Sequence, residues 1–256
     1  MNLRKLIFTE NACYKAGRKI TVKGIMVHSA GANNPWLKRY VGPDDGLLGK
    51  NQYNNHWNTH HPGGREVCVH GFIGKLADGS VGMVQTLPWN CRGWHAGMSA
   101  GNTRYIGFEI CEDGLVDPDY FKATRDGAVE LVAELCRMFK LDPLKDGVVI
   151  CHAEGFKRGV ASNHGDIIHW WSKFDYTMAD FRRDVAERME DDNMTQEKFN
   201  EMMDNYLAHL ATLPPSDWAK KNLADAVSLG FTDGTSPRAL ATREQVALMI
   251  RAAVYG

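Results

Sequence analysis

The sequence predicts an α/β domain followed by a small helical module. From residue 1 to about 190, short apolar runs of strand length alternate with amphipathic helical patterns. The composition then changes, and residues 194–256 show helical patterns only. With 256 residues, 44% of them hydrophobic, the chain is long enough to bury a core and to add a second, smaller domain.

Five segments of the first domain carry the β-branched and aromatic residues that are typical of strands. The first of them ends at His28 and is followed by a loop rich in Gly and Asn. The second and third flank the turn sequence ADGS, so we expect them to pair as a hairpin. The predicted strands are Ile25–His28, Val67–Ile73, Val81–Leu87, 103–114 and 146–152.

Helical patterns separate these strands, and the longest has clear start signals. Asp117 can cap its first turn, and Pro118 suits the first helical position. Its apolar stripe consists of Val129, Leu131, Val132, Leu135 and Phe139. The predicted helices of the first domain lie at 51–64, 117–143 and 175–191.

The second module contains three helical patterns. The first has an apolar side and is ended by two prolines. Ser216 and Thr242 are natural N-caps for the other two, and Gln245 lies at the capping-box spacing from Thr242. The apolar side of the first pattern consists of Phe199, Met202, Met203, Tyr206, Leu207 and Leu210.

Charge and composition exclude several classes of function. The formal net charge of −1 at pH 7 provides no basic field for nucleic acid. No segment approaches the ~20 apolar residues of a membrane span. The six cysteines are scattered without a CxxC pair, which indicates reduced thiols rather than a disulfide framework. The N-terminal apolar run is too short for a signal peptide, so we expect cytoplasmic synthesis and release by another agent.

The stretch CHAEGFKRGVASNHGDIIHWW, from Cys151 to Trp171, holds the densest group of chemically active side chains. His152 ends a predicted strand, as His28 does. Two strand-end histidines and one loop carboxylate could hold zinc with an open fourth position for water. Glu109, on the predicted strand 103–114, is the best candidate to take the proton of that water.

Ordinary explanations remain open at this point. His56, His60 and His61 suit the surface of a polar helix, and His169 suits packing beside Trp170. Glu109 could be an exposed strand residue, and the WHAG sequence at 94–97 could be a simple turn. The residues alone therefore favour a metal site and a polar loop about equally.

A set of motifs in one order extends the interpretation. The strings IMVHS, VCVHGFIG, WHAG, YIGFEI and CHAEGFKRGVASNHGD resemble the type-2 N-acetylmuramoyl-L-alanine amidases over about residues 20–175. The strings HSAGANNPWLKRYV and HAEGFKRGVASNHGDIIHWW are similar to the phage and prophage endolysin branch of this family. These amidases share the fold of peptidoglycan recognition proteins. The resemblance implies a mixed central β-sheet flanked by helices and a Zn²⁺ hydrolase. The resemblance implies that this hydrolase cleaves the amide bond between the lactyl group of N-acetylmuramic acid and L-alanine in bacterial peptidoglycan.

The resemblance also implies roles for individual residues. His28, His152 and Asp166 correspond to the three zinc ligands. Glu109 corresponds to the glutamate that works with the zinc water, and His95 to a histidine that lines the substrate site.

One position departs from the family pattern. His164 stands where the family often has the lysine that polarises the scissile carbonyl, and it competes with Asp166 for the role of third ligand. The Pro-Gly that usually follows the ligand is replaced by IIHWW. Trp94, Lys157 and Asn163 complete the expected substrate-binding residues. Lys157 and Arg158 would meet stem-peptide carboxylates, and Trp170 and Trp171 would pack or face glycan.

The second module resembles a single S-layer-homology-like module, which implies attachment to cell-wall polymers. Packing or formation of a homodimer is the alternative. For the whole chain, the resemblance predicts an endolysin that reaches the wall after holin-type release. The alternative from another class is a peptidoglycan-binding protein without catalysis, and a weaker third option is a hydrolase of small muropeptides in wall recycling. Neither nucleic acid nor a membrane is an expected partner.

Overall fold

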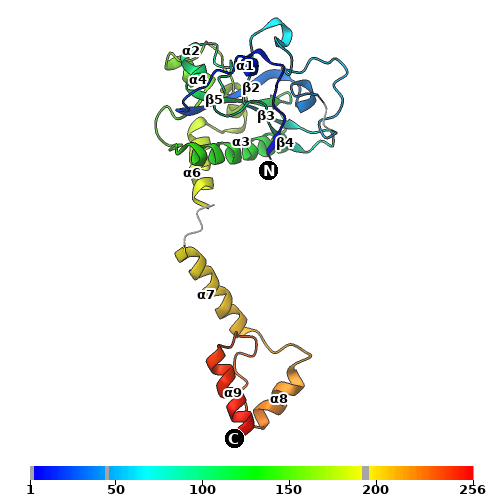
Figure 1. Cartoon of the computed structure of the whole chain (residues 1–256), viewed down its shortest axis with the longest axis vertical. Helices are drawn as coiled ribbons and strands as arrows, with labels where there is room; N and C mark the ends of the chain where they lie inside the picture. The colour runs from blue at the N-terminus through cyan, green and yellow to red at the C-terminus, as the bar shows by residue number, and fades with distance from the viewer. Residues whose placement is uncertain (1–2, 44–45, 192–195, 256) are drawn as a thin grey trace. The chain divides into compact units, whose positions relative to one another are not determined.

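The computed structural model describes residues 3–43, 46–191 and 196–255 (Figure 1). Contacts divide the chain into two compact units, Met1–Asp192 and Asn193–Gly256. The predicted junction between residues 190 and 194 includes positions that lie outside the described residues. Each unit is therefore considered by itself.

A mixed sheet forms the centre of the first unit, as predicted. Its strand order is β1-β4-β3-β5-β2-β6. The hairpin partners β3 and β4 are antiparallel, whereas every other neighbouring pair is parallel. The strands are β1 (Leu3–Lys5), β2 (Gly24–Asn33), β3 (Gly71–Lys75), β4 (Val81–Gln85), β5 (Tyr105–Glu112) and β6 (Val149–Cys151).

Helix α3 (Pro118–Phe139) runs along one face of this sheet (Figure 1) and packs beside α6 (Met178–Asp191). The predicted start of α3 is confirmed, because the Asp117 side chain accepts hydrogen bonds from the backbone N–H groups of Asp119 and Tyr120. The shorter helices are α1 (Ala12–Lys15), α2 (Ser99–Asn102), α4 (His152–Lys157) and α5 (Ile168–Trp171), with 3₁₀ turns at Leu37–Arg39, Pro62–Gly64 and Ser172–Phe174.

Strand alternation divides the two faces of the sheet. On β5, Phe108 and Ile110 belong to the main core cluster, which also contains the buried side of α3. Cys111 belongs to a second cluster, which covers the other face with Leu37 and Tyr40. Since successive strand residues point to opposite faces, polar side chains of β2 and β5 can project away from α3 without entering its core.

The predicted helix at 51–64 is wrong. The described residues there form turns and bends, with one 3₁₀ turn at Pro62–Gly64. Asn51 explains the difference, because its side chain donates to the Lys38 carbonyl and accepts from the Tyr53 backbone N–H. Such side-chain bonds offer the backbone an alternative to the helix.

Between residues 196 and 255, the second unit contains three helices, α7 (Gln196–Thr212), α8 (Lys220–Ser228) and α9 (Arg243–Tyr255). The capping box of α9 is confirmed by reciprocal hydrogen bonds between Thr242 and Gln245. The predicted Ser216 cap is wrong, since α8 begins after Ala219 and the backbone carbonyl of Ser216 accepts the nearby N–H groups. The three helices bury none of their described side chains.

Two further properties of the described chain bear on its class. Every described helix is too short or too polar to cross a lipid bilayer. All six cysteines are free thiols, as their scattered positions predict.

Candidate metal centre

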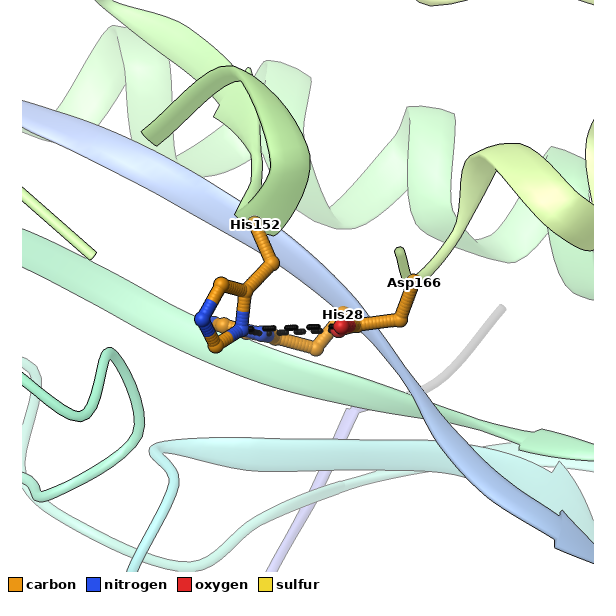
Figure 2. Close-up of side chains that lie close together, drawn as sticks. All are labelled: His28, His152 and Asp166. Atoms are coloured by element: carbon orange, nitrogen blue, oxygen red, sulfur yellow. Dashed lines mark hydrogen bonds and ion pairs between the residues drawn. The ribbon is translucent and has the colours of Figure 1, made fainter. Parts of the chain in front are cut away.

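Three side chains converge at the carboxyl end of β6, beside the middle of the neighbouring parallel strand β2. His28 lies on β2, and His152 is the first residue of α4, directly after β6. Asp166 lies in the loop before α5. Figure 2 shows the three side chains pointing toward one another from these separate elements. Parallel pairing of β2 with β6 is what brings two histidines that are 124 residues apart to the same point.

The spacing of the ligand atoms fits a tetrahedral metal. The Nδ1 atom of His28 lies 3.1 Å from Nδ1 of His152 and 3.1 Å from Oδ2 of Asp166. The other oxygen of the same carboxylate, Asp166 Oδ1, lies 3.6 Å from Nδ1 of His152. Tetrahedral zinc with bonds of about 2.0–2.2 Å separates its ligand atoms by roughly 3.3–3.6 Å. Burial lowers the pKa of His152 to about 4, which keeps its ring neutral and able to bind a metal.

His95 fixes the orientation of the His28 ring. Its Nε2 lies 3.1 Å from the Tyr105 carbonyl oxygen, which can only accept, so Nε2 carries the proton. Burial, and then His28, lowers the pKa of His95 well below its usual value, so its Nδ1 is free to accept. That Nδ1 lies 3.0 Å from His28 Nε2, which must therefore donate. A metal ion bound between His28 and Asp166 would take the place of the proton on His28 Nδ1, which lies 3.1 Å from the Asp166 carboxylate.

This geometry changes the expectation for His95. The residue does line the main cavity, as a substrate-contacting side chain would. Both of its ring nitrogens, however, have partners within the protein. A substrate can reach only its carbon edge, so His95 offers no free hydrogen-bonding atom for recognition.

Glu109 is adjacent to the ligand group, in register with His28 on the neighbouring strand. Its Oε2 is buried and has no hydrogen-bond partner among the described residues. Burial raises the pKa of its carboxyl group from 4.5 to about 7. The alternative that Glu109 is an ordinary exposed strand residue is therefore wrong. A carboxyl group with this pKa can accept and return a proton near neutral pH.

A cavity of about 650 Å³ opens over these groups. Of the predicted site residues it contains the three ligands, Glu109, His95, Trp94 and His164. Lys157 and Asn163 are not among its walls. Lys157 lies at the exposed end of α4, and Asn163 is exposed between Ser162 and His164, which do face the cavity. Arg158 is also held elsewhere, by an ion pair with Asp146.

His164 lies at the exposed side of the site. Its Nδ1 is 3.0 Å from the Ser162 hydroxyl, and its ring centroid is 4.7 Å from that of His152. The group of converging ligand atoms found among the described residues consists of His28, His152 and Asp166, without His164. The geometry thus favours Asp166 over His164 as the third ligand.

The sequence did not indicate a second group beside the ligands. Glu112, buried at the end of β5, accepts a hydrogen bond from the Ser29 hydroxyl and lies 3.0 Å from Nε2 of His169. The other ring nitrogen of His169 lies 3.3 Å from the carbonyl of Gly165, the residue before Asp166. His169 was expected to be a packing residue, but it connects β5 to the loop that carries Asp166.

The two tryptophans after His169 have a different place. Trp170 and Trp171 are almost fully buried, at 0% and 2% exposure, in the core beneath the sheet. They pack and do not face glycan. The cavity walls that the sequence missed include Trp57 and Arg65. Trp57 lies in the segment for which a helix was expected and Arg65 directly follows it, and no local pattern reveals the direction of either side chain.

Comparison with known proteins places this site in a family. The family model described as N-acetylmuramoyl-L-alanine amidase matches residues 18–170, more than half of the chain. No curated protein sequence matches.

Solved structures show the same fold. A crystal structure of the Staphylococcus aureus hydrolase AmiA in complex with its ligand has a TM-score of 0.51 and 18% identity, covering 74% of this chain and 83% of that one. The structure of PlyL has a TM-score of 0.50 and 21% identity, covering 72% of this chain and 97% of that one. The solution structure of the PlyG catalytic domain has a TM-score of 0.50 and 18% identity, covering 74% and 96%.

Proposed function

The chain belongs to the N-acetylmuramoyl-L-alanine amidase family, which acts on peptidoglycan, and we propose that it cleaves its substrate with one zinc ion held by His28, His152 and Asp166. The observation that carries the proposal is the convergence of two histidine nitrogens and the Asp166 carboxylate, at 3.1–3.6 Å from one another, beside the unpartnered oxygen of Glu109. When bound there, zinc acidifies a water molecule and polarises the scissile carbonyl.

Glu109 acts as the proton carrier. Its carboxylate takes the proton of the attacking water and then delivers it to the nitrogen of the departing L-alanine. Amines leave poorly as anions, so the second transfer is as necessary as the first. The raised pKa of Glu109, about 7, suits both steps near neutral pH.

His164 assists at the carbonyl oxygen. It lies on the cavity wall, outside the ligand group, and its ring N–H can donate to the oxygen as negative charge develops there. Ser162 steadies the other ring nitrogen at 3.0 Å. His164 therefore replaces the lysine that members of this family often have at the position.

The biological role that we assign is that of a phage or prophage endolysin. This assignment rests on the resemblance of the motifs between residues 20 and 175 to that branch. We assign the second unit to wall attachment, because it is compact by its own contacts and exposes aromatic side chains such as Trp218 and Tyr255.

Mass spectrometry of digested peptidoglycan tests the activity. We expect intact glycan strands and free stem peptides that begin with a new L-alanine amino terminus. Removal of the metal with a chelator should abolish the products, and added zinc should restore them. Walls that are bound without any new amino terminus would instead support the non-catalytic binding protein.

A further inference from the structure

A second cavity, of about 370 Å³, lies beside the main one. Trp94 lines both, so the two cavities meet at this residue. The backbone of Trp94 is fixed by two hydrogen bonds with Cys68. A substrate that extends beyond the reacting bond in this direction would pass over Trp94 into the second cavity.

Two arginines face this second cavity from adjacent segments. The Arg92 backbone N–H donates to the Arg18 carbonyl at 2.8 Å, next to a β-bridge between Lys19 and Cys91. The Arg92 guanidinium donates to the Ser99 hydroxyl and lies 5.4 Å from the centre of the Trp94 ring. One cation is thus held in place by its neighbours before any ligand arrives.

The charges of these arginines have no acidic partner within the described residues. Glu66 is the single carboxylate in the cavity wall, and its side chain lies 3.9 Å from Nε2 of His61 rather than beside either arginine. The pKa of the Cys13 thiol is lowered by its hydrogen bond with Cys68 and further by Arg92 and Arg18. Both guanidinium groups therefore act on the same region of the cavity.

The substrate's chemistry identifies the group that they would bind. The lactyl carboxyl of N-acetylmuramic acid is consumed in the amide that is cut, so the glycan beside that bond carries no carboxylate. The carboxylates near the bond belong to the stem peptide, which begins at L-alanine. The sequence suggested Lys157 and Arg158 for these carboxylates. Lys157 lies outside the main cavity, however, and Arg158 forms an ion pair with Asp146.

We propose that Arg18 and Arg92 form an anion subsite that binds a carboxylate of the stem peptide. The proposal rests on the proposed amidase function, and it assigns the second cavity to the peptide side of the substrate. A guanidinium pair matches the planar carboxylate and binds it with charge-assisted hydrogen bonds. Phosphate groups of wall polymers share this chemistry, so the test must separate the two sources.

The test compares a soluble muropeptide that has free carboxylates with the same muropeptide after amidation of those carboxylates. For the double variant Arg18→Gln/Arg92→Gln, we expect KM for the free-carboxylate form to rise about tenfold with kcat unchanged. KM for the amidated form should not change. Lys157→Gln is the matched control, because it removes an exposed cation that lines neither cavity.

Binding to the metal-free protein provides a second measurement. Calorimetry should show that the double variant loses affinity for the free-carboxylate muropeptide, and the single variant Arg18→Gln should lose part of it. Arg18 is exposed, so this single change should leave the fold intact. Equal KM changes on both muropeptides, no change on either, or lost binding only for a glycerol-phosphate oligomer would overturn the subsite. A parent protein that cuts neither muropeptide would count against the amidase function instead.

Discussion

The carboxyl group of Glu109 combines a buried, unpartnered oxygen with a pKa raised to about 7. Glu109→Gln keeps the shape of the side chain but cannot carry a proton. We expect the variant to retain zinc while turnover falls by roughly 100-fold or more. Steady-state kinetics and metal analysis on the same preparation would check this.

The pH profile provides the control for Glu109. A general base must be ionised, so kcat/KM of the parent should rise as pH increases through the pKa of this carboxyl group. The corresponding limb should be absent from Glu109→Gln. Turnover of the variant within about threefold of the parent would show that another group carries the proton, with His164 as the next candidate.

The assignment of the third ligand is tested by two substitutions. Asp166→Ala removes an oxygen from the ligand group and should reduce the zinc content of the purified protein. His164→Ala removes a ring outside that group and should keep zinc but slow turnover. Elemental analysis distinguishes the two, and the reverse pattern would transfer the ligand role to His164.

At the residue scale, the site residues at expected strand ends could be predicted from the sequence, whereas those placed by a loop conformation could not. His28 and His152 could be predicted to approach each other because each was expected to end a buried strand, and the ends of parallel strands lie at one edge of a sheet. The interaction of Glu112 with His169 could not, since it joins residues 57 positions apart through the loop conformation. Lys157 was misplaced because α4 turns its end away from the cavity.

At the scale of the elements, the His95 ring packs directly against β5 at Gly107, which has no side chain. A Cβ atom on Gly107 would lie only 2.3–2.5 Å from ring atoms of His95. Gly107→Ala should therefore displace His95 from His28 and weaken zinc binding, on the order of 10- to 100-fold, as loss of a partner of a metal-bound histidine does. Competition with a chromogenic chelator would measure the affinity.

Gly82 on β4 is the matched control for this substitution. A Cβ there would approach only the end of the Leu76 side chain, at 3.0 Å, which can move aside. Gly82→Ala should bind zinc as the parent does. If Gly107→Ala did so too, His95 would not be holding His28 in its binding orientation.

Hydrophobic patterns predicted these elements unevenly. The hairpin β3–β4, the strand β5 and the capped helix α3 follow directly from alternation, turn residues and cap residues. The segment 51–64 fails because it is held by asparagine side chains and by contacts with Tyr40, which periodicity does not encode. β2 also extends to Asn33, beyond its predicted end at His28, because β5 continues beside it.

At the scale of the whole molecule, we expect the stability of the first unit to depend on pH through the protonation of His70. This ring is fully buried, donates to the Cys91 carbonyl and accepts from the Gly107 N–H, and burial lowers its pKa to about 4. The unfolded chain, with a histidine pKa near 6.5, binds more protons than the folded one between these values. Stability is therefore complete above pH ~6.5 and falls as the pH drops toward 4, by roughly 3 kcal/mol.

Urea unfolding of the metal-free protein at pH 7 and pH 4.5 would measure this loss. His70→Gln keeps one donor and one acceptor but does not titrate, so its free energy of unfolding should change much less between the two pH values. His152 titrates in the same direction in both proteins and cancels in the comparison. An identical pH dependence in parent and variant would contradict the prediction.

The division into two units suggests a truncation. A chain that ends at residue 191 keeps every wall of the main cavity. We expect it to cleave soluble muropeptide at the rate of the full chain and to lose activity only on intact walls, if the second unit attaches to them. Equal losses on both substrates would show that the units do not act separately.

The ligands of the metal centre are also far apart along the chain, since His28 is 124 residues from His152 and 138 from Asp166. Contacts that close such long loops form late in folding, after most of the entropy of the chain has been lost. A metal bound at this point would hardly accelerate folding, but it would slow unfolding. An ion that binds there would then set the lifetime of the folded protein as well as take part in the chemistry.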